Sequence, residues 1–235
     1  MRHKIIKKTN SPIVVVPGML LIVIFMAAMN YPAEHKKSYT YLALGDSYTI
    51  GEKVPSKDNF PSQVRQFLSA KGLAIKSPKI IAKTGWTTDE LEVAIKKEKT
   101  KPRYDFVTLL IGVNNQYRGR TTGNYRPEFE SLLKQAIRFA DNDPSHVIVL
   151  SIPDWGATPF AGDRNREEIS RAINEYNAVN KDVSATYSVH YIDITPGTRK
   201  AAEDPELVAE DGLHPSGKEY AIWAELVGAI MEKNQ

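Results

Sequence analysis

The chain is organised around one stretch, Leu44-Gly45-Asp46-Ser47-Tyr48-Thr49-Ile50-Gly51. It follows a short apolar run that begins at Tyr41, and it precedes a polar stretch that extends to Phe60. A short apolar run that stops at Gly-Asp-Ser is typical of a buried strand ending in a loop that presents a hydroxyl. Ser47 is therefore a candidate nucleophile, although Asp and Ser also form ordinary turns, which this stretch by itself favours.

A second stretch near the other end of the chain changes this balance: Asp211-Gly212-Leu213-His214-Pro215. A serine hydroxyl is a weak nucleophile at neutral pH and needs an adjacent base, usually a histidine that a carboxylate holds in the right tautomer. The spacing Asp-x-x-His in a loop bounded by Gly and Pro lets both side chains come from one turn. We expect His214 to be the base and Asp211 its orienting partner.

Two more short loops contain glycine and follow apolar runs, namely Thr84-Gly85-Trp86 and Gly112-Val113-Asn114-Asn115. An acyl-transfer site needs donors for the developing oxyanion, and a glycine backbone amide and an asparagine side-chain amide are suitable donors. The alternative for Asn114-Asn115 is a turn, since Asn tolerates left-handed backbone conformations. The four loops together predict a single acyl-transfer site.

These four blocks resemble those of the SGNH (GDSL-type) esterase and lipase family, in the same order and over roughly residues 40 to 230. The resemblance implies that Ser47 is the nucleophile and one oxyanion donor, with Gly85 and Asn114 as the other donors. It also implies that His214 is the base and Asp211 its orienter. The implied activity is the hydrolysis of carboxylic esters through a catalytic triad and an oxyanion hole, without a cofactor.

Two positions depart from the usual pattern of that family. Asn115 stands where the family often has Asp, and Lys83-Thr84 stands where an Asn often lies near the glycine. Both departures leave the proposed donors in place, so they concern the subfamily more than the chemistry. The nucleophile elbow Gly-x-Ser-x-Gly of a different hydrolase fold is not matched, because Thr49 follows Ser47 by two.

Buried strands alternate with amphipathic helices along the chain, which predicts an α/β fold with helices on both faces of a parallel sheet. The resemblance implies a three-layer α/β/α sandwich with a central, mostly parallel sheet, the flavodoxin-like SGNH hydrolase fold. The site residues are all expected in loops after strands, at the edge where such sheets bind ligands. Strands are expected at 41–44, 79–82, 105–111, 146–152 and around 191–194, and helices at 61–71, 88–99, 129–140, 169–183 and after residue 216.

Two of the expected helices carry an N-terminal signal. Thr87 with Glu90 and Ser216 with Glu219 both fit the capping box, in which each side chain bonds the backbone of the other residue. The first box places Gly85 just ahead of a helix start, and the second places His214 just ahead of another.

Aromatic residues near the four loops are candidates for lining a substrate pocket. Trp155 lies in the loop 153–159 after an expected strand, where it either lines a pocket or merely covers the end of the sheet. Further candidates for lining the pocket are Trp86, Tyr117 and Asp46, the residue just before Ser47.

Residues 1–30 differ in character from the remainder of the chain. Four basic residues precede an uncharged run of 17 residues, 13–29, with small residues at Ala27 and Ala28. This is the pattern of a secretory signal peptide, and the run is marginal for a membrane-spanning helix, which needs about 20 residues. We expect export to the periplasm or the extracellular space. The alternative is an uncleaved anchor that associates with the membrane through residues 13–29.

Residues 31–38 are expected to be a linker and 39–235 the hydrolase domain.

Composition narrows the possible partners. The chain has no cysteine, which excludes disulfides and thiolate metal sites. The formal charge of the chain is +3, but residues 1–30 hold four basic and no acidic residues, so the remainder carries 3 − 4 = −1. A nearly neutral domain lacks the basic footprint of a nucleic-acid-binding protein. The other histidines show no paired ligand spacing, so no metal is expected. We therefore expect a monomer of one domain, whose partner is a small-molecule ester.

Two classes of function are consistent with these patterns. The leading hypothesis is a serine esterase that forms an acyl-enzyme at Ser47; short acyl esters, acetyl groups on a glycan, lysophospholipids and acyl thioesters all suit that chemistry. The alternative is a non-catalytic carbohydrate- or envelope-binding module that uses Trp86, Trp155 and Tyr117 for stacking. An intact Ser, His and Asp argue against the alternative, because a binding module needs no aligned base.

Overall fold

The structure is a computed structural model that describes residues 37–98 and 103–235. The expected export segment, residues 1–30, and most of the expected linker lie outside the described residues. Within the described ranges, no helix combines the length and the apolar character needed to cross a membrane.

A five-stranded sheet forms the centre of the domain. Its strands are β1 Tyr41–Asp46, β2 Lys79–Lys83, β3 Phe106–Leu110, β4 Val147–Leu150 and β5 His190–Ile192. They are parallel and adjacent in the order β2-β1-β3-β4-β5. Strands β1, β3 and β4 are buried along their whole length, as expected of a parallel sheet that is covered on both faces.

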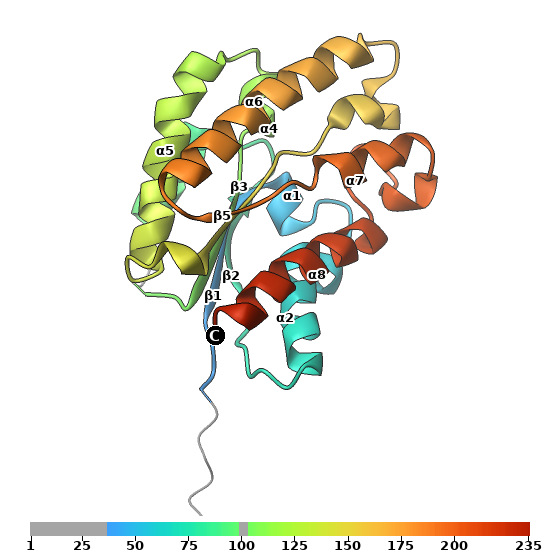
Figure 1. The fold of residues 1–235 in the computed structure, drawn as a ribbon. Helices are drawn as coiled ribbons and strands as arrows, with labels where there is room; N and C mark the ends of the chain where they lie inside the picture. Colours follow the sequence, from blue (N-terminus) through green and yellow to red (C-terminus); the bar gives the residue numbers. More distant parts are fainter. Residues whose placement is uncertain (1–36, 99–102) are drawn as a thin grey trace, which may run out of the picture. The chain divides into compact units, whose positions relative to one another are not determined.

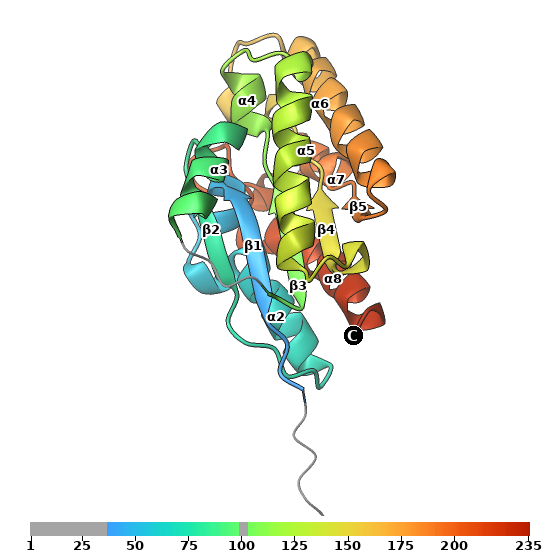
Figure 2. The same ribbon diagram turned by 90° about the vertical axis from the view of Figure 1, so that its left-hand side faces the viewer.

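Helices cover both faces of this sheet (Figure 1). One face carries α3 (Thr88–Lys97), α5 (Thr122–Phe139) and α6 (Arg166–Thr186), and Figure 2 shows α5 in front of the strands. The opposite face carries α2 (Phe60–Ala70) and α8 (Gly217–Lys233), which pack side by side. The predicted three-layer α/β/α fold is therefore confirmed, and so is the parallel sheet.

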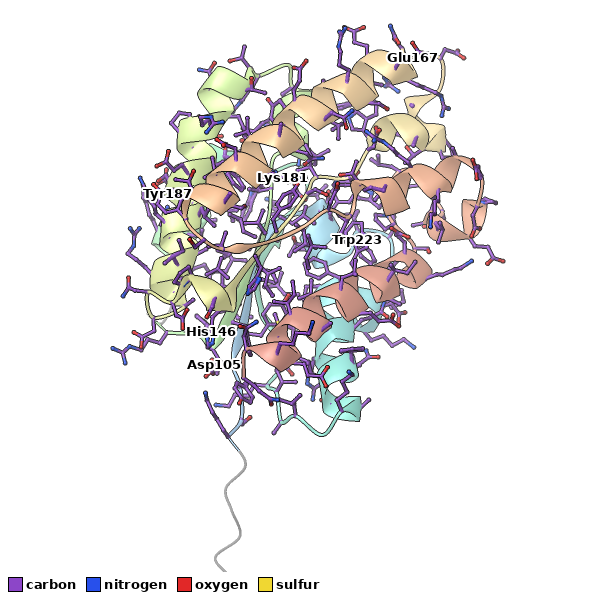
Figure 3. The ribbon with its side chains drawn as sticks, viewed as in Figure 1. Asp105, His146, Glu167, Lys181, Tyr187 and Trp223 are labelled. Carbon is purple, nitrogen blue, oxygen red and sulfur yellow. The ribbon has the colours of Figure 1, made fainter. Side chains whose placement is uncertain are left out.

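The layer of α2 and α8 is held by large apolar side chains. Trp223 of α8, labelled in Figure 3, is 1% exposed and its ring centroid lies 6.2 Å from that of Phe60 of α2. Gly228 of α8 packs so closely on Phe67 that a Cβ there would meet the ring at 2.8 Å and less. Burial of this face fixes α8, and thereby the chain segment just before it.

The two predicted capping boxes differ in outcome. Thr87 and Glu90 form a complete box at the start of α3. At α8, the Ser216 side chain accepts the N–H of Glu219, but the Glu219 carboxylate instead accepts a hydrogen bond from Trp223 Nε1 at 2.8 Å. The buried indole N–H of Trp223, one turn further along α8, needs an acceptor. The Glu219 carboxylate accepts from this indole instead of from the backbone N–H of Ser216.

Two short helices stand where loops were expected, α1 (Ser47–Ile50) and α4 (Val113–Tyr117). A third short helix, α7 (Thr195–Arg199), lies in a stretch for which no element was predicted. Ser47 is the first residue of α1, and Asn114 lies within α4. The expectation that every site residue lies in a loop was therefore wrong for these two. Helices of four or five residues are too short to show an apolar periodicity in the sequence.

The strand order places the candidate site at a switch point. From β1 the chain continues to β2, which lies on one side of β1, and then crosses to β3, which lies on the other side. The carboxyl ends of β1 and β3 therefore border the crevice in which such sheets bind ligands. Ser47 follows β1 and Asn114 follows β3. Asp105 and His146, labelled in Figure 3, precede β3 and β4 and so lie at the opposite end of the sheet.

Candidate active site

Ser47 is presented by a sharp change from strand to helix. Asp46 ends β1 and caps α1, because its side chain accepts the backbone N–H of Tyr48 at 3.0 Å. Gly45 is required just before it, since a Cβ at Gly45 would collide with the Thr49 side chain and with the carbonyl of Leu110. The close approach of β1, α1 and β3 thus fixes the position of the Ser47 hydroxyl.

Ser47, His214 and Asp211 form a continuous hydrogen-bonded chain. Ser47 Oγ lies 2.9 Å from His214 Nε2, and His214 Nδ1 lies 2.6 Å from Asp211 Oδ2. Ser47 is 4% exposed and His214 is 6% exposed. The structure therefore brings together the three residues that the sequence predicted as nucleophile, base and orienting partner.

The loop that carries His214 is held by its own backbone. Asp211 Oδ1 accepts the N–H groups of Leu213 and His214, both at 3.0 Å. Burial raises the pKa of the Asp211 carboxyl, but the hydrogen bonds from His214 and from these backbone groups outweigh burial and hold the pKa below its usual value. An ionised Asp211 keeps the ring proton on Nδ1, so His214 Nε2 is free to accept the proton of Ser47.

Asn114 lies in α4, shortly after β3, and lines the same hollow as Ser47. Its position depends on Gly112, which has a φ of 129° and packs against the Tyr125 ring too closely for any Cβ. Asn114 Nδ2 donates to the carbonyl of Trp86 at 3.0 Å and lies 3.4 Å from Asp46 Oδ2. One N–H of the Asn114 amide therefore makes a short hydrogen bond to Trp86, whereas the other makes only a long, weak one to Asp46.

Gly85 occupies the turn between β2 and α3 with a φ of 82°, in the left-handed region that favours glycine. Its carbonyl accepts a hydrogen bond from Arg118 Nη2 at 2.6 Å. Its N–H has no acceptor among the described residues. Gly85, Asn114 and Ser47 all line one hollow, so the three candidate oxyanion donors surround a common space.

This catalytic hollow encloses a space of about 520 Å³ open to solvent. Tyr117 and Trp155 contribute to its wall, with ring centroids 5.3 Å apart, and Phe160 adjoins both. Trp86 does not line the hollow; its side chain borders a separate groove along α3. The lining residues are Ser47, Tyr48, Thr84, Gly85, Val113, Asn114, Tyr117, Trp155, Phe160, Leu213 and His214.

Several of these lining residues were not predicted from the sequence. Tyr48, Val113 and Leu213 each stand one position from a candidate site residue, which is the only sequence signal they carry. Phe160 reaches the hollow because its backbone N–H donates to the carbonyl of Gly212 at 2.9 Å, joining two loops that are distant in sequence. No local pattern could have indicated that contact.

Asp46 lies beneath the site rather than on its wall. It is fully buried and does not border the catalytic hollow. Burial raises the pKa of Asp46 to about 7, although the N–H of Tyr48 and the amide of Asn114 favour its ionised form. The structure thus places this residue, predicted as a lining residue, one layer below the lining.

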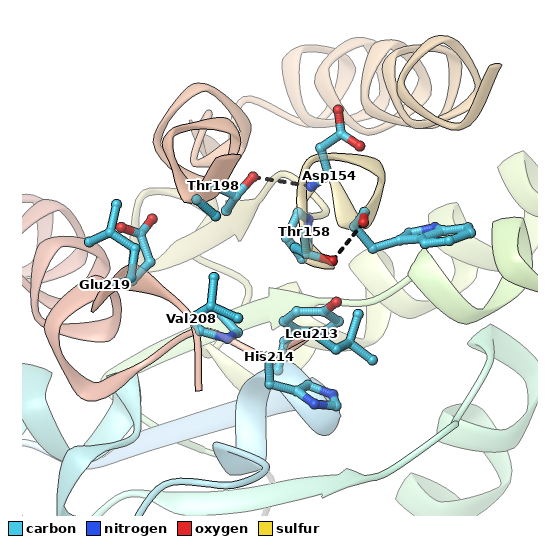
Figure 4. Close-up of a pocket in the computed structure, with 13 residues that line it drawn as sticks. Asp154, Thr158, Thr198, Val208, Leu213, His214 and Glu219 are labelled. Atoms are coloured by element: carbon cyan, nitrogen blue, oxygen red, sulfur yellow. Dashed lines mark hydrogen bonds between the residues drawn. The ribbon is translucent and has the colours of Figure 1, made fainter. Parts of the chain in front are cut away.

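A smaller pocket of about 290 Å³ adjoins the catalytic hollow and shares Tyr48, Trp155, Leu213 and His214 with it (Figure 4). Glu219 borders this pocket at 2% exposure. Glu219 Oε2 has no hydrogen-bond partner in the described part of the chain, and burial raises the pKa of this carboxyl.

Other polar groups around the smaller pocket already have partners. The Thr158 hydroxyl donates to the carbonyl of Trp155 at 2.8 Å, and the N–H of Asp154 donates to Thr198 Oγ1 at 3.1 Å. No group of three or more His, Asp or Glu side chains within 37–98 and 103–235 is arranged to hold a metal ion.

Comparison with known proteins agrees with this arrangement. The family model of the GDSL-like lipase/acylhydrolase family matches residues 43–222. No curated protein matches the chain.

Solved structures of similar fold include proteins that are named as esterases. TesA has a TM-score of 0.63 and 18% identity, over 83% of this chain and 99% of that one. Axe2, an acetylxylan esterase from Geobacillus stearothermophilus, has a TM-score of 0.64 and 17% identity, over 82% of this chain and 94% of that one. The psychrotrophic esterase EstA from Pseudoalteromonas sp., inhibited by monoethylphosphonate, has a TM-score of 0.56 and 17% identity, over 83% and 96%. The chain therefore belongs to the GDSL-like lipase/acylhydrolase family of carboxylic ester hydrolases.

Proposed function

We propose that the protein is a serine esterase that hydrolyses its substrate through an acyl-enzyme at Ser47. The observation that carries this proposal is the chain of hydrogen bonds from Ser47 Oγ to His214 Nε2 at 2.9 Å and from His214 Nδ1 to Asp211 Oδ2 at 2.6 Å. This is the arrangement of nucleophile, base and orienter that activates a serine hydroxyl.

In the first half of the reaction, Ser47 Oγ attacks the ester carbonyl carbon while its proton passes to His214 Nε2. The carbonyl oxygen gains negative charge, which the N–H groups of Ser47 and Gly85 and the amide of Asn114 stabilise. The first N–H groups of a helix have no intrahelical partner, so the N–H of Ser47 at the start of α1 suits this task. The C–O bond then breaks, and His214 gives the proton to the departing alcohol.

In the second half, water replaces the alcohol. His214 Nε2 takes a proton from the water as its oxygen attacks the acyl carbon, and the same donors stabilise the second oxyanion. The bond to Ser47 Oγ breaks and Oγ recovers the proton, which releases the carboxylic acid. Asp211, ionised through both halves, stabilises the imidazolium that forms twice.

The substrate that suits the lining of the hollow is an uncharged ester. Among the described residues that line the hollow, none is Lys, Arg, Asp or Glu, and one wall consists of Tyr117, Trp155 and Phe160. Such a wall favours a flat or apolar substituent. The similar fold of an acetylxylan esterase supports acetyl esters as the first substrates to test.

A panel of p-nitrophenyl esters of increasing acyl length, together with acetylated sugars, tests this proposal. The expected result is hydrolysis that is fastest for the acetyl to butyryl esters and absent in Ser47→Ala. Equal rates for wild type and Ser47→Ala on every ester would contradict a serine esterase. Fastest turnover of long-chain esters would leave the mechanism intact and overturn the substrate class.

The location proposed for the enzyme is outside the cytoplasm. Basic residues before residue 13 should keep the N-terminus in the cytoplasm, and the uncharged run 13–29 should direct the following chain across the membrane. Fractionation of the tagged full-length chain with N-terminal sequencing tests this location. A shortened chain in the exported fraction is the expected result, an intact Met1 in the membrane fraction indicates the anchored alternative, and an intact Met1 in the cytosol contradicts export.

A further inference from the structure

Side chains of α4 hold the turn that carries Gly85. Asn114 Nδ2 donates to the carbonyl of Trp86 at 3.0 Å. The next residue, Asn115, is fully buried, accepts the N–H of Thr88 at 3.1 Å and donates to Thr88 Oγ1 at 2.7 Å. Two successive side chains of one short helix thus bond the backbone on either side of the start of α3, and Figure 2 shows α3 and α4 close together.

Arg118 adds a third attachment to the same turn. It directly follows α4, and its Nη2 donates to the carbonyl of Gly85 at 2.6 Å. Arg118 Nη1 also lies 3.2 Å from Glu90 Oε1, on the first turn of α3. A planar guanidinium can serve two acceptors at once in a fixed geometry, which a flexible ammonium cannot do.

The turn needs such attachments because its central residue is a glycine. Gly85 has a φ of 82°, and glycine adopts positive and negative φ values about equally readily. Rotation about the N–Cα bond of Gly85 would redirect its N–H without breaking any bond made by that N–H, since it has no acceptor among the described residues. The Gly85 carbonyl belongs to the next peptide plane, which shares the Gly85 Cα with the plane of the N–H. A carbonyl held at 2.6 Å by Arg118 fixes that next plane, against which the plane of the N–H is set.

We propose that Arg118 is a positioning residue of the oxyanion hole, which holds the Gly85 carbonyl so that the Gly85 N–H stays directed at the reacting carbonyl oxygen. This inference rests on the proposed function, because it assigns to Gly85 the role of an oxyanion donor. Arg118 itself touches neither the nucleophile nor the base, and it does not line the catalytic hollow. It acts on the oxyanion through the Gly85 carbonyl that it holds.

Arg118→Gln tests the inference. The shorter neutral side chain loses the contact with the Gly85 carbonyl, so the oxyanion should be bound less well while the ester in its ground state is bound equally. We expect kcat to fall about tenfold with KM changed less than about twofold, within the hundredfold that misplacement of a catalytic group can cost. Arg118→Lys, which keeps one donor but not the fork, should restore part of the loss.

Two controls separate this role from general effects of charge. Arg126 of α5 pairs with Asp182 and has a side-chain exposure of 46%, close to the 44% of Arg118, so Arg126→Gln removes the same charge from a similar environment. Glu90→Gln removes the acidic partner of Arg118 but preserves the capping box, which accepts Glu or Gln. Both variants should retain the wild-type kcat within about twofold, because neither removes the donor to the Gly85 carbonyl and a Gln side chain at position 90 still offers Arg118 a carbonyl acceptor.

Affinity for a tetrahedral transition-state analogue distinguishes positioning from partial unfolding. A trifluoromethyl ketone forms an oxyanion adduct on a serine nucleophile, so its inhibition constant should rise in Arg118→Gln by the same factor by which kcat/KM falls. A mere loss of folded enzyme would lower the rate and leave the inhibition constant unchanged. That outcome would overturn the inference, and so would an unchanged kcat, a change confined to KM, or an equal loss in Glu90→Gln.

The wild-type enzyme distinguishes failure of this inference from failure of the proposed function. If the wild type hydrolyses esters and Ser47 reacts with a fluorophosphonate, while Arg118→Gln equals the wild type, only the role of Arg118 is wrong. If the wild type hydrolyses no ester and Ser47 does not react, the proposed function is wrong and the role of Arg118 falls with it.

Discussion

Asp46 lies beneath Asn114, with Asp46 Oδ2 3.4 Å from Asn114 Nδ2. The other carboxyl oxygen of Asp46 accepts the N–H of Tyr48 at 3.0 Å and so caps the helix that begins at Ser47. One fully buried carboxyl group therefore faces both the helix of the candidate nucleophile and the candidate side-chain donor. This relationship connects the carboxyl ends of β1 and β3 at the switch point of the sheet.

The pH dependence of stability should report on Asp46. Burial raises the pKa of Asp46 in the folded protein to about 7, above the ordinary value of 3.8, so the folded protein binds this proton more tightly than the unfolded chain does. Asp46 therefore lowers the free energy of unfolding as pH rises from about 4 to about 7, and its cost is constant above that range. Asp46→Asn should remove this decline.

Urea unfolding of Asp46→Asn and wild type at several pH values tests this prediction. The difference in the free energy of unfolding, variant minus wild type, should increase from about pH 4 to about pH 7 and then level off. Asp163→Asn makes the same substitution at an exposed position and serves as the matched control. A flat difference for Asp46→Asn would show that burial does not raise the pKa of this carboxyl in the folded protein.

Asn114→Ala should impair the chemical step more than substrate binding. Loss of one oxyanion donor commonly lowers kcat by about 10² to 10³, which corresponds to about 2.7 to 4 kcal/mol. Steady-state kinetics should show this loss with KM nearly unchanged, while Asn174→Ala, an exposed asparagine of α6, should match the wild type. A raised KM with an unchanged kcat would mean that Asn114 binds the ground state of the ester.

Ser47→Ala and His214→Ala should have effects that do not add. Each variant alone should nearly abolish hydrolysis of activated esters, because nucleophile and base act as one unit. The double variant should then be scarcely slower than either single variant. If the losses of the two single variants instead multiplied in the double variant, Ser47 and His214 would be acting independently, and their 2.9 Å contact would have no catalytic meaning.

Tyr117→Ala should change substrate affinity with only a modest effect on stability. Tyr117 is 50% exposed on the wall of the catalytic hollow, and its edge-on contact with Trp155 is worth about 0.5 to 1.5 kcal/mol, so its removal should lower the free energy of unfolding by about that amount. Loss of aromatic packing against the substrate is worth about 0.5 to 1.5 kcal/mol, which predicts a KM raised about two- to tenfold for esters that reach this ring. An unchanged KM across a panel of aryl and sugar esters would remove Tyr117 from the binding surface.

The sequence predicted those parts of the fold and site that leave a local pattern. Continuous apolar runs predicted the strands, including β3 and β4, because a parallel sheet buries both faces of each strand. The blocks around Ser47 and His214 predicted residues that the structure brings together across 167 positions of sequence. Their spacing and the resemblance to SGNH hydrolases carried that prediction, and the family assignment is confirmed.

Other features depend on tertiary contacts that no local pattern records. Glu219 fits a capping box in sequence, yet Trp223 takes its carboxylate in the folded protein. Trp86 borders a groove along α3 instead of the catalytic hollow, since nothing in the order of residues determines the side on which its ring leaves the turn. Phe160 enters the hollow only because its loop bonds Gly212.

The most direct test of the account is to identify the residue that becomes covalently modified. Incubation of the wild-type protein with a fluorophosphonate, followed by intact-mass and peptide mass spectrometry, should show one adduct per chain on the peptide that contains Ser47. Esterase activity should disappear in step with its formation, and Ser47→Ala should remain unmodified. An adduct on another residue, or full loss of activity with Ser47 unmodified, would contradict the assignment of Ser47 as the nucleophile.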